Sequence, residues 1–172
     1  MTDRAPTGYR TSQIGLHWLV AALVLFLFIT GDSTTHVFSA GEGGRASDAS
    51  WTWVPIHLAA GVAILAAMLW RLELRREFGA PEPPASEPRA LRWLASAVHI
   101  GLYVDLIGAA IVGMLVYFGA HGLAPLHELM TRAVLIALVG LHVAGALWHQ
   151  FYWRDNVLRR MLRPVGESQT RP

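Results

Sequence analysis

Four long apolar runs separated by polar connections dominate the pattern of residues along the chain. A helix needs about 20 mostly apolar residues to cross the hydrocarbon core of a bilayer, and each run is long enough, the first two only just. The pattern predicts helices over about residues 14–30, 54–70, 94–118 and 126–153. Pro55 falls in the first turn of its predicted helix, where a missing N–H is tolerated. The sequence therefore predicts an all-α integral membrane four-helix bundle with an up-down-up-down path.

The composition is typical of a membrane protein. Of the 172 residues, 53% are hydrophobic and 15% are charged, whereas soluble domains average about 25% charged residues. The absence of cysteine excludes disulfides, iron–sulfur ligation and covalent haem attachment through C-x-x-C-H. The net charge of +2 is small and is not gathered into one patch, so no nucleic-acid partner is expected. The apolar composition instead predicts membrane lipid as the partner. With no internal repeat, residues 1–172 are predicted to form a single transmembrane domain.

The arginines are distributed unevenly between the two sides of the predicted bundle. All 14 basic residues are arginine, and twelve of them lie in the N-terminal segment, the second connection and the C-terminal tail. Only Arg45 and Arg132 fall on the other side. Since short cytoplasmic segments of membrane proteins carry an excess of basic residues, both termini and the second connection are predicted to be cytoplasmic.

Histidines are the chemically informative residues of the chain. Six of the eight lie in or at the ends of the apolar runs, where an imidazole is costly unless it faces the bundle interior with a partner. By position they form an outer layer and an inner layer: His57 and His127, then His17, His99, His142 and His149. His36 and His121 fall in outside loops and are predicted to be solvated.

The fourth run carries a histidine towards each surface of the membrane. His127 and His142 are separated by about 22 Å along a helix that rises ~1.5 Å per residue. Their side chains differ by only ~60° in direction around that helix. One helix therefore offers two imidazoles on nearly one face, an arrangement that suits two cofactors stacked across a bilayer.

The kind of cofactor follows from the ligands on offer. Zinc sites usually close around a compact ligand set, whereas these imidazoles are split into two layers with few acidic neighbours. Haem b needs one or two axial imidazoles and an apolar slot with small residues against its faces, and two imidazoles on each iron favour electron transfer. The competing interpretation of a single membrane histidine is a structural hydrogen bond across helices.

Four stretches carry a family resemblance: YRTSQIGLHW, PIHLAAGVAILAAMLWRL, HIGLYVDLIGAAIVG and HELMTRAVLIALVGLHVAGALWHQFYWRDNVLRRM. The last is the most specific, because it joins HE, GLH, a His seven residues later and an RDN-x-L-x-RM ending. From about Tyr9 to Arg163 the chain resembles the bacterial cytochrome b561 family, whose plan is shared by cytochrome b subunits of hydrogenases and formate dehydrogenases. The resemblance implies a multi-pass protein of the bacterial inner (plasma) membrane.

The resemblance also implies axial ligands for two haems b. The inner haem would be held by His17 and His142, and the outer haem by His57 and His127. The residues themselves leave the inner pair open, since His149 or His99 lies at a depth that would also suit a partner of His17.

His99 and His149 have no role in iron ligation if the other four membrane histidines hold the two haems. His149 lies two helical turns beyond His142, on the same face to within about 20°. A quinone needs hydrogen-bond donors and a proton source near water, which histidine can supply. The two histidines are therefore predicted to form a cytoplasmic site for ubiquinone.

Three arginines and one acid complete the candidate residues. Arg10, Arg71 and Arg92 are predicted to pair with haem propionates, since Arg binds carboxylates in a bidentate fork, although each would also serve as an anchor at the lipid headgroups. Asp105 lies about midway along the third run, where an apolar residue is usual in the family. It is expected either to handle protons or to make a local hydrogen bond.

The function predicted is electron transfer between a periplasmic one-electron donor and the membrane quinone pool through two bis-histidine haems, and the family resemblance implies that this donor can be superoxide. The protein would be an oxidoreductase or an electron carrier. One rival is a membrane-anchor cytochrome subunit that serves a hydrogenase, a dehydrogenase or a partner cytochrome. The other is a haem-free protein that uses histidines for metal transport or for structural hydrogen bonds.

Overall fold

The computed structural model of the chain describes residues 6–31, 48–84 and 87–164. His36 and Arg45, named above, lie outside the described residues, as do Arg4 of the N-terminal segment and Arg171 of the C-terminal tail.

The part of the chain that the structure describes is mostly helical and contains no strand, which confirms the predicted fold class. Three long helices come first: α1 (Thr11–Thr30), α3 (Asp48–Phe78) and α4 (Arg89–Tyr117). A composite fourth span follows, made of η2 (His121–Leu123), α5 (Ala124–Glu128), η3 (Leu129–Val134), α6 (Leu135–Trp148) and η4 (His149–Trp153). The short helix α7 (Val157–Arg160) comes last. All four spans are long and apolar enough to cross a membrane.

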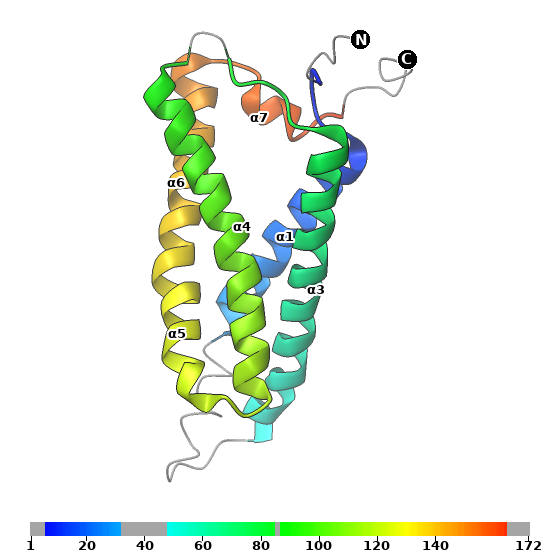
Figure 1. The fold of residues 1–172 in the computed structure, drawn as a ribbon, viewed down its shortest axis with the longest axis vertical. Helices are drawn as coiled ribbons and strands as arrows, with labels where there is room; N and C mark the ends of the chain where they lie inside the picture. Colours follow the sequence, from blue (N-terminus) through cyan, green and yellow to red (C-terminus); the bar gives the residue numbers. More distant parts are fainter. Residues whose placement is uncertain (1–5, 32–47, 85–86, 165–172) are drawn as a thin grey trace.

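Successive spans lie next to each other in an up-down-up-down path (Figure 1). Helix α1 packs against α3, α3 against α4, and α4 against α6. The start of α1, the α3–α4 connection and α7 share one end of the bundle, called the terminal end below (Figure 1). The α4–α5 connection lies at the opposite end, called the distal end.

Apolar side chains join the spans and also cover their outer faces. The shared core consists of Leu16, Val20, Ile64, Ala67, Met68, Leu74, Leu106 and Leu135. Large side chains on the outer faces, such as Leu25, Ile29 and Trp70, are exposed. Such exposure is expected in a bilayer, because lipid tails are as apolar as leucine.

The helices extend beyond the apolar runs that predict them. Helix α3 covers Asp48–Phe78, since Arg, Glu and Leu are good helix formers and a helix that leaves the hydrocarbon keeps its backbone hydrogen bonds. Arg71 consequently lies on α3 and Arg92 on α4, and neither is in a loop. Pro55 lies inside α3 rather than in its first turn, where it removes one helical hydrogen bond.

Gln13 ties the start of α1 to the end of α3. Its Oε1 accepts a hydrogen bond from the backbone N–H of Arg10 at 3.0 Å, and its Nε2 donates to the carbonyl of Gly79 at 3.1 Å. Gly79 has a φ of 71°, a left-handed conformation that glycine adopts without strain and that ends α3. The terminal end is thereby fixed by polar contacts outside the apolar core.

The fourth span departs from regular α-helix at two places. Segments η3 and η4 form π-helical turns, in which backbone hydrogen bonds join residues i and i+5. Segment η3 lies between His127 and His142, so their relative direction differs from the ~60° that a regular helix gives. Segment η4 begins at His149. Such turns are frequent at functional sites; here η4 starts at a histidine, and η3 starts two residues after His127.

Candidate cofactor site

His57 and His127 face each other near the distal end. Helix α3 supplies His57 and α5 supplies His127, and their ring centroids are 6.3 Å apart with the planes at 78°. Both Nδ1 atoms are buried and have no hydrogen-bond partner among the described residues. Unpaired buried polar atoms are costly, so these two nitrogens are available to meet a cofactor, while the His127 ring also has a backbone hydrogen bond with Ala109 of α4.

Three histidines from three spans meet nearer the terminal end. The rings of His17 on α1 and His142 on α6 have centroids 6.0 Å apart, at 58°. His99 on α4 lies closer still to His142, with centroids 5.0 Å apart and planes at 87°. Nδ1 of His99 is 2.7 Å from the carbonyl oxygen of Ala95, so this nitrogen acts as a hydrogen-bond donor within its own helix.

The separation of the rings tests which pairs fit a shared metal. A first-row metal holds an imidazole nitrogen at about 2.0–2.1 Å, and the ring centroid lies ~1.1 Å further on, so two opposed imidazoles place their centroids about 6.3 Å apart. His57 with His127, at 6.3 Å, and His17 with His142, at 6.0 Å, fit this requirement. His99 with His142, at 5.0 Å, does not.

Glycines provide the space around these rings. A Cβ added to Gly113 on α4 would lie 2.8 Å from Cε1 of His127, so only glycine lets that ring lie against α4. Gly61 lies one helical turn from His57, and Gly145 lies one turn from His142, each on the same helix face as its histidine. A Cβ added at either glycine would meet no atom within 4 Å. The helix surface beside each histidine is therefore open, as it must be where the flat face of a haem lies against a helix.

His149 lies between two carboxylates at the terminal end. Its Nδ1 is 2.6 Å from Oδ2 of Asp155, and its Nε2 is 3.6 Å from Oε1 of Glu87. The Glu87 side chain is only 4% exposed. The ring of Trp153 packs edge-on against the imidazole, with centroids 4.9 Å apart. Both nitrogens of His149 therefore face acids.

Arg71 on α3 contacts the start of α1. Its Nη1 donates to the carbonyl oxygen of Gln13 at 3.4 Å, and Gln13 precedes His17 by one helical turn on α1. The guanidinium therefore lies on the terminal side of the inner histidines, where it could bind a carboxylate.

Arg10 and Arg92 have partners of their own at the terminal end. The Arg10 guanidinium lies 4.0 Å from the centroid of the Phe78 ring, a cation–π contact. Arg92 donates from Nε and Nη2 to the carbonyl oxygen of Glu87, at 3.0 and 2.8 Å. Arg92 thereby holds the backbone that carries the Glu87 side chain towards His149.

Tyr9 lies just before the first span, close to several arginines of the terminal end. Burial raises the pKa of its phenol, and the charges of Arg75, Arg71 and Arg160 act in the opposite direction. The phenol is neutral at physiological pH and adds no negative charge to the terminal end.

Asp105 is buried within its span, whereas His121 is exposed at the end of the bundle. Asp105 is 4% exposed, and its Oδ2 has no hydrogen-bond partner among the described residues, so the local hydrogen bond expected for Asp105 is not made by that oxygen. His121 is exposed at the distal end.

Glu87 and Asp155 are the residues of this region that sequence reasoning misses. Asp155 follows His149 by six residues within the RDN motif, and a helix that ended there would turn it back towards the imidazole. Glu87 gives no such signal, since it belongs to a proline-rich connection whose path no periodicity predicts.

Four apolar spans with opposed histidines at two depths are typical of a multi-pass membrane cytochrome. Residues 8–164 match the family of prokaryotic cytochrome b561, and the chain belongs to that family. Membership implies haem b and a role in membrane electron transfer.

Three curated relatives cover almost the whole chain. Cytochrome b562 of Cereibacter sphaeroides is 28% identical over 157 residues, which cover 91% of this chain and 96% of the relative. A probable superoxide oxidase, CybB, of Yersinia pestis is 28% identical over 90% of this chain and 95% of the relative. Cytochrome b561 homolog 1 of Escherichia coli K12 is 26% identical over 90% and 96%.

Proposed function

We propose that the protein carries electrons between a one-electron donor on the periplasmic side and the membrane quinone pool, through two haems b. The observation that carries this proposal is the pair of opposed imidazoles at each of two depths, with ring centroids 6.3 and 6.0 Å apart. The whole chain acts as one transmembrane domain of the bacterial inner membrane, with both termini in the cytoplasm. The twelve arginines of the N-terminal segment, the second connection and the C-terminal tail support that orientation.

Each histidine pair joins spans that are distant in sequence. His57 and His127 would hold the distal haem between α3 and α5, and His17 and His142 would hold the terminal haem between α1 and α6. Haems held in this way would supply one-electron transfer. Arg71 would bind a propionate of the terminal haem, since Arg binds carboxylates in a bidentate fork.

The terminal end reduces ubiquinone to its quinol with the help of His99 and His149. His149 donates through Nδ1 to Asp155, at 2.6 Å, which leaves Nε2 facing Glu87 at 3.6 Å. The Asp155 side chain is 20% exposed and that of Glu87 is 4% exposed. The imidazole is thus placed to pass protons from the partly exposed acid to the buried one, while His99 lies beside His142.

Superoxide is the donor that the comparisons favour. A relative in Yersinia pestis is named a probable superoxide oxidase, and superoxide is small enough to reach a haem beneath the short connection between α4 and α5. Arg132 at this end attracts anions, but Glu128 lies 3.8 Å away and offsets part of its charge. Electrostatic attraction at the distal end is consequently modest.

The proposal is tested by following both half-reactions with the purified holoprotein. A superoxide-generating system is expected to reduce the haems, seen in the α band, and added ubiquinone is expected to reoxidise them. Superoxide dismutase should abolish the first step and leave the second unchanged. If dithionite-reduced haems are not reoxidised by ubiquinone, the quinone part of the proposal is wrong; if superoxide fails to reduce them, a different donor serves the distal haem.

A further inference from the structure

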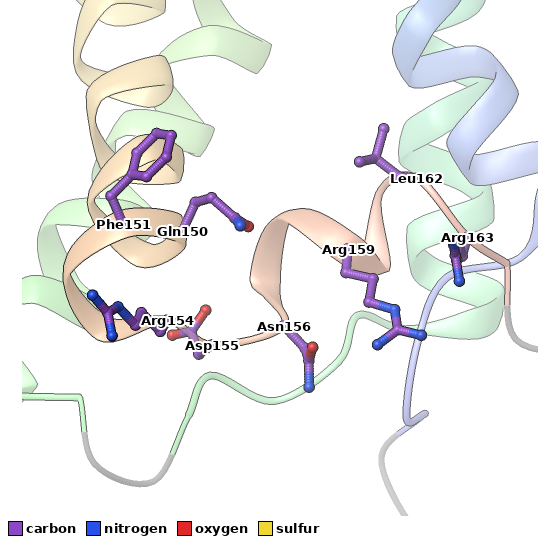
Figure 2. Close-up of a pocket in the computed structure, with 8 residues that line it drawn as sticks. All are labelled: Gln150, Phe151, Arg154, Asp155, Asn156, Arg159, Leu162 and Arg163. Atoms are coloured by element: carbon purple, nitrogen blue, oxygen red, sulfur yellow. The ribbon is translucent and has the colours of Figure 1, made fainter.

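A hollow of about 810 Å³ opens at the terminal end, where the fourth span passes into α7 (Figure 2). Its lining combines three arginines, two apolar side chains and three other polar residues: Arg154, Arg159, Arg163, Phe151, Leu162, Gln150, Asp155 and Asn156. None of the three arginines is among the candidate haem or quinone residues.

The local backbone brings these arginines to the hollow. Arg154 ends the fourth span in a left-handed conformation, with φ of 51° and ψ of 38°, so the chain turns sharply there. Arg159 and Arg163 are four residues apart, and the N–H of Arg163 donates to the carbonyl of Arg159 at 3.0 Å. Residues at this spacing lie on one helical face. The hollow is thus bordered by Arg154 on one side and by Arg159 and Arg163 on the other (Figure 2).

The positive charge of these arginines is not neutralised by the protein around them. Within residues 6–31, 48–84 and 87–164, no ion pair or side-chain hydrogen bond is formed by the guanidinium groups of Arg154, Arg159 and Arg163. The one acid in the lining, Asp155, already accepts hydrogen bonds from His149 and from the backbone N–H of Val157. The hollow therefore presents unpaired guanidinium groups to a ligand.

The lining is also divided by polarity. Phe151 and Leu162 point towards the side of the hollow from which the spans extend, whereas Arg159 and Asn156 point the other way (Figure 2). Phe151 is 72% exposed and Leu162 is 57% exposed. A soluble anion would contact the arginines alone, whereas a phospholipid would contact both parts of the lining, its headgroup at the arginines and its acyl chains at Phe151 and Leu162.

We propose that this hollow binds the headgroup of an anionic phospholipid, with the phosphodiester held by Arg154, Arg159 and Arg163. Guanidinium groups bind phosphate oxygens in bidentate pairs, and basic pockets beside membrane spans are suited to anionic headgroups. The three arginines are separate from the candidate haem ligands, and of the quinone-site residues only Asp155 borders the hollow.

The experiment compares phospholipid retention by the full-length holoprotein and by two matched double variants. R159Q/R163Q removes two charges from the hollow, and R76Q/R89Q removes two charges from exposed positions elsewhere at the terminal end. Delipidated protein in mild detergent is titrated with phosphatidylglycerol or phosphatidylcholine, and bound lipid is counted by native mass spectrometry. Haem spectra confirm that each variant is folded.

Wild-type protein and R76Q/R89Q are expected to bind phosphatidylglycerol in preference to phosphatidylcholine. R159Q/R163Q should lose about tenfold or more in apparent affinity for phosphatidylglycerol, since each arginine near an anionic surface contributes about a fivefold factor. Equal losses in both double variants, or none in R159Q/R163Q, would overturn the proposal. Displacement of phosphatidylglycerol by millimolar inorganic phosphate would also overturn it, because the site would then take a soluble anion.

Discussion

At the scale of single residues, the buried imidazole nitrogens of the distal pair are the main support for haem ligation by His57 and His127. Nδ1 of His57 and Nδ1 of His127 are buried and have no partner among the described residues. Leaving a polar atom buried and unpaired costs about 1–3 kcal/mol, so the two rings need a compensating interaction. Coordination of one iron through the opposed rings would supply it, and each ring is then indispensable for the haem between them.

Replacement of His57 or His127 by Ala is therefore expected to remove the distal haem and spare the terminal one. The ratio of haem to protein in a pyridine haemochrome assay should fall by about half, since a bis-histidine haem needs both ligands. His121→Ala is the matched control, because His121 is exposed at the same end, and it should keep the full haem content. If His127→Ala keeps both haems with bis-histidine spectra, the distal assignment is wrong and His121 becomes the candidate ligand.

His99 and His149 give a second prediction at this scale. His99→Ala and His149→Ala should preserve both haem spectra and slow oxidation of the reduced protein by ubiquinone about tenfold or more, because proton transfer by a placed side chain contributes at least that factor. Stopped-flow absorbance measures the rate. Asp155→Asn should resemble His149→Ala, since it removes the acceptor of the 2.6 Å hydrogen bond. Loss of the terminal haem in His99→Ala or His149→Ala would instead show that the replaced histidine, rather than His142, is a ligand of that haem.

At the scale of elements, the close approach of α4 to the fourth span decides where His127 lies. A Cβ at Gly108 would come 2.9 Å from Cε of Met130, and one at Gly113 would come 2.8 Å from Cε1 of His127. At Gly108 the flexible end of a methionine side chain can move aside. At Gly113 the group that would have to move is the imidazole itself.

Gly113→Ala is accordingly expected to displace the His127 ring and to weaken or abolish the distal haem, at a cost of about 1–3 kcal/mol from overpacking. Gly140→Ala is the control, because an added Cβ at Gly140 meets no atom within 4 Å and the residue points away from the His142 face. Optical spectra and thermal unfolding midpoints of the two variants provide the measurement. Unchanged distal haem in Gly113→Ala would show that His127 is not held against α4.

At the scale of the whole molecule, the described ends of the chain share one end of the bundle (Figure 1). Most of the arginines cluster there as well, and the positive-inside rule then predicts cytoplasmic termini. Alkaline phosphatase, which is active only in the periplasm, should be silent when fused after Pro172 and active when fused after Gly122. High activity at Pro172 would reverse the orientation and exchange the faces of the two haems.

The fold was predictable because a bilayer restricts it so strongly. Spanning segments must be helices that satisfy their own backbone hydrogen bonds, so apolar runs reveal them, and depth along each run separates His57 and His127 from His17 and His142. Rotation of one helix against another was not predictable, since the π turns and the fit of Gly113 against His127 arise from packing. The contact of Glu87 with His149 likewise depends on a connection without periodicity.

The central claim is that opposed imidazoles hold two haems b in one chain. The most direct measurement is the haem content of the purified, full-length protein, by pyridine haemochrome assay, against its concentration from amino-acid analysis. The account predicts a ratio of about two, with low-spin bis-histidine spectra for both haems. A ratio of about one would contradict the two-layer site, and protein that purifies intact with no haem would contradict the account as a whole.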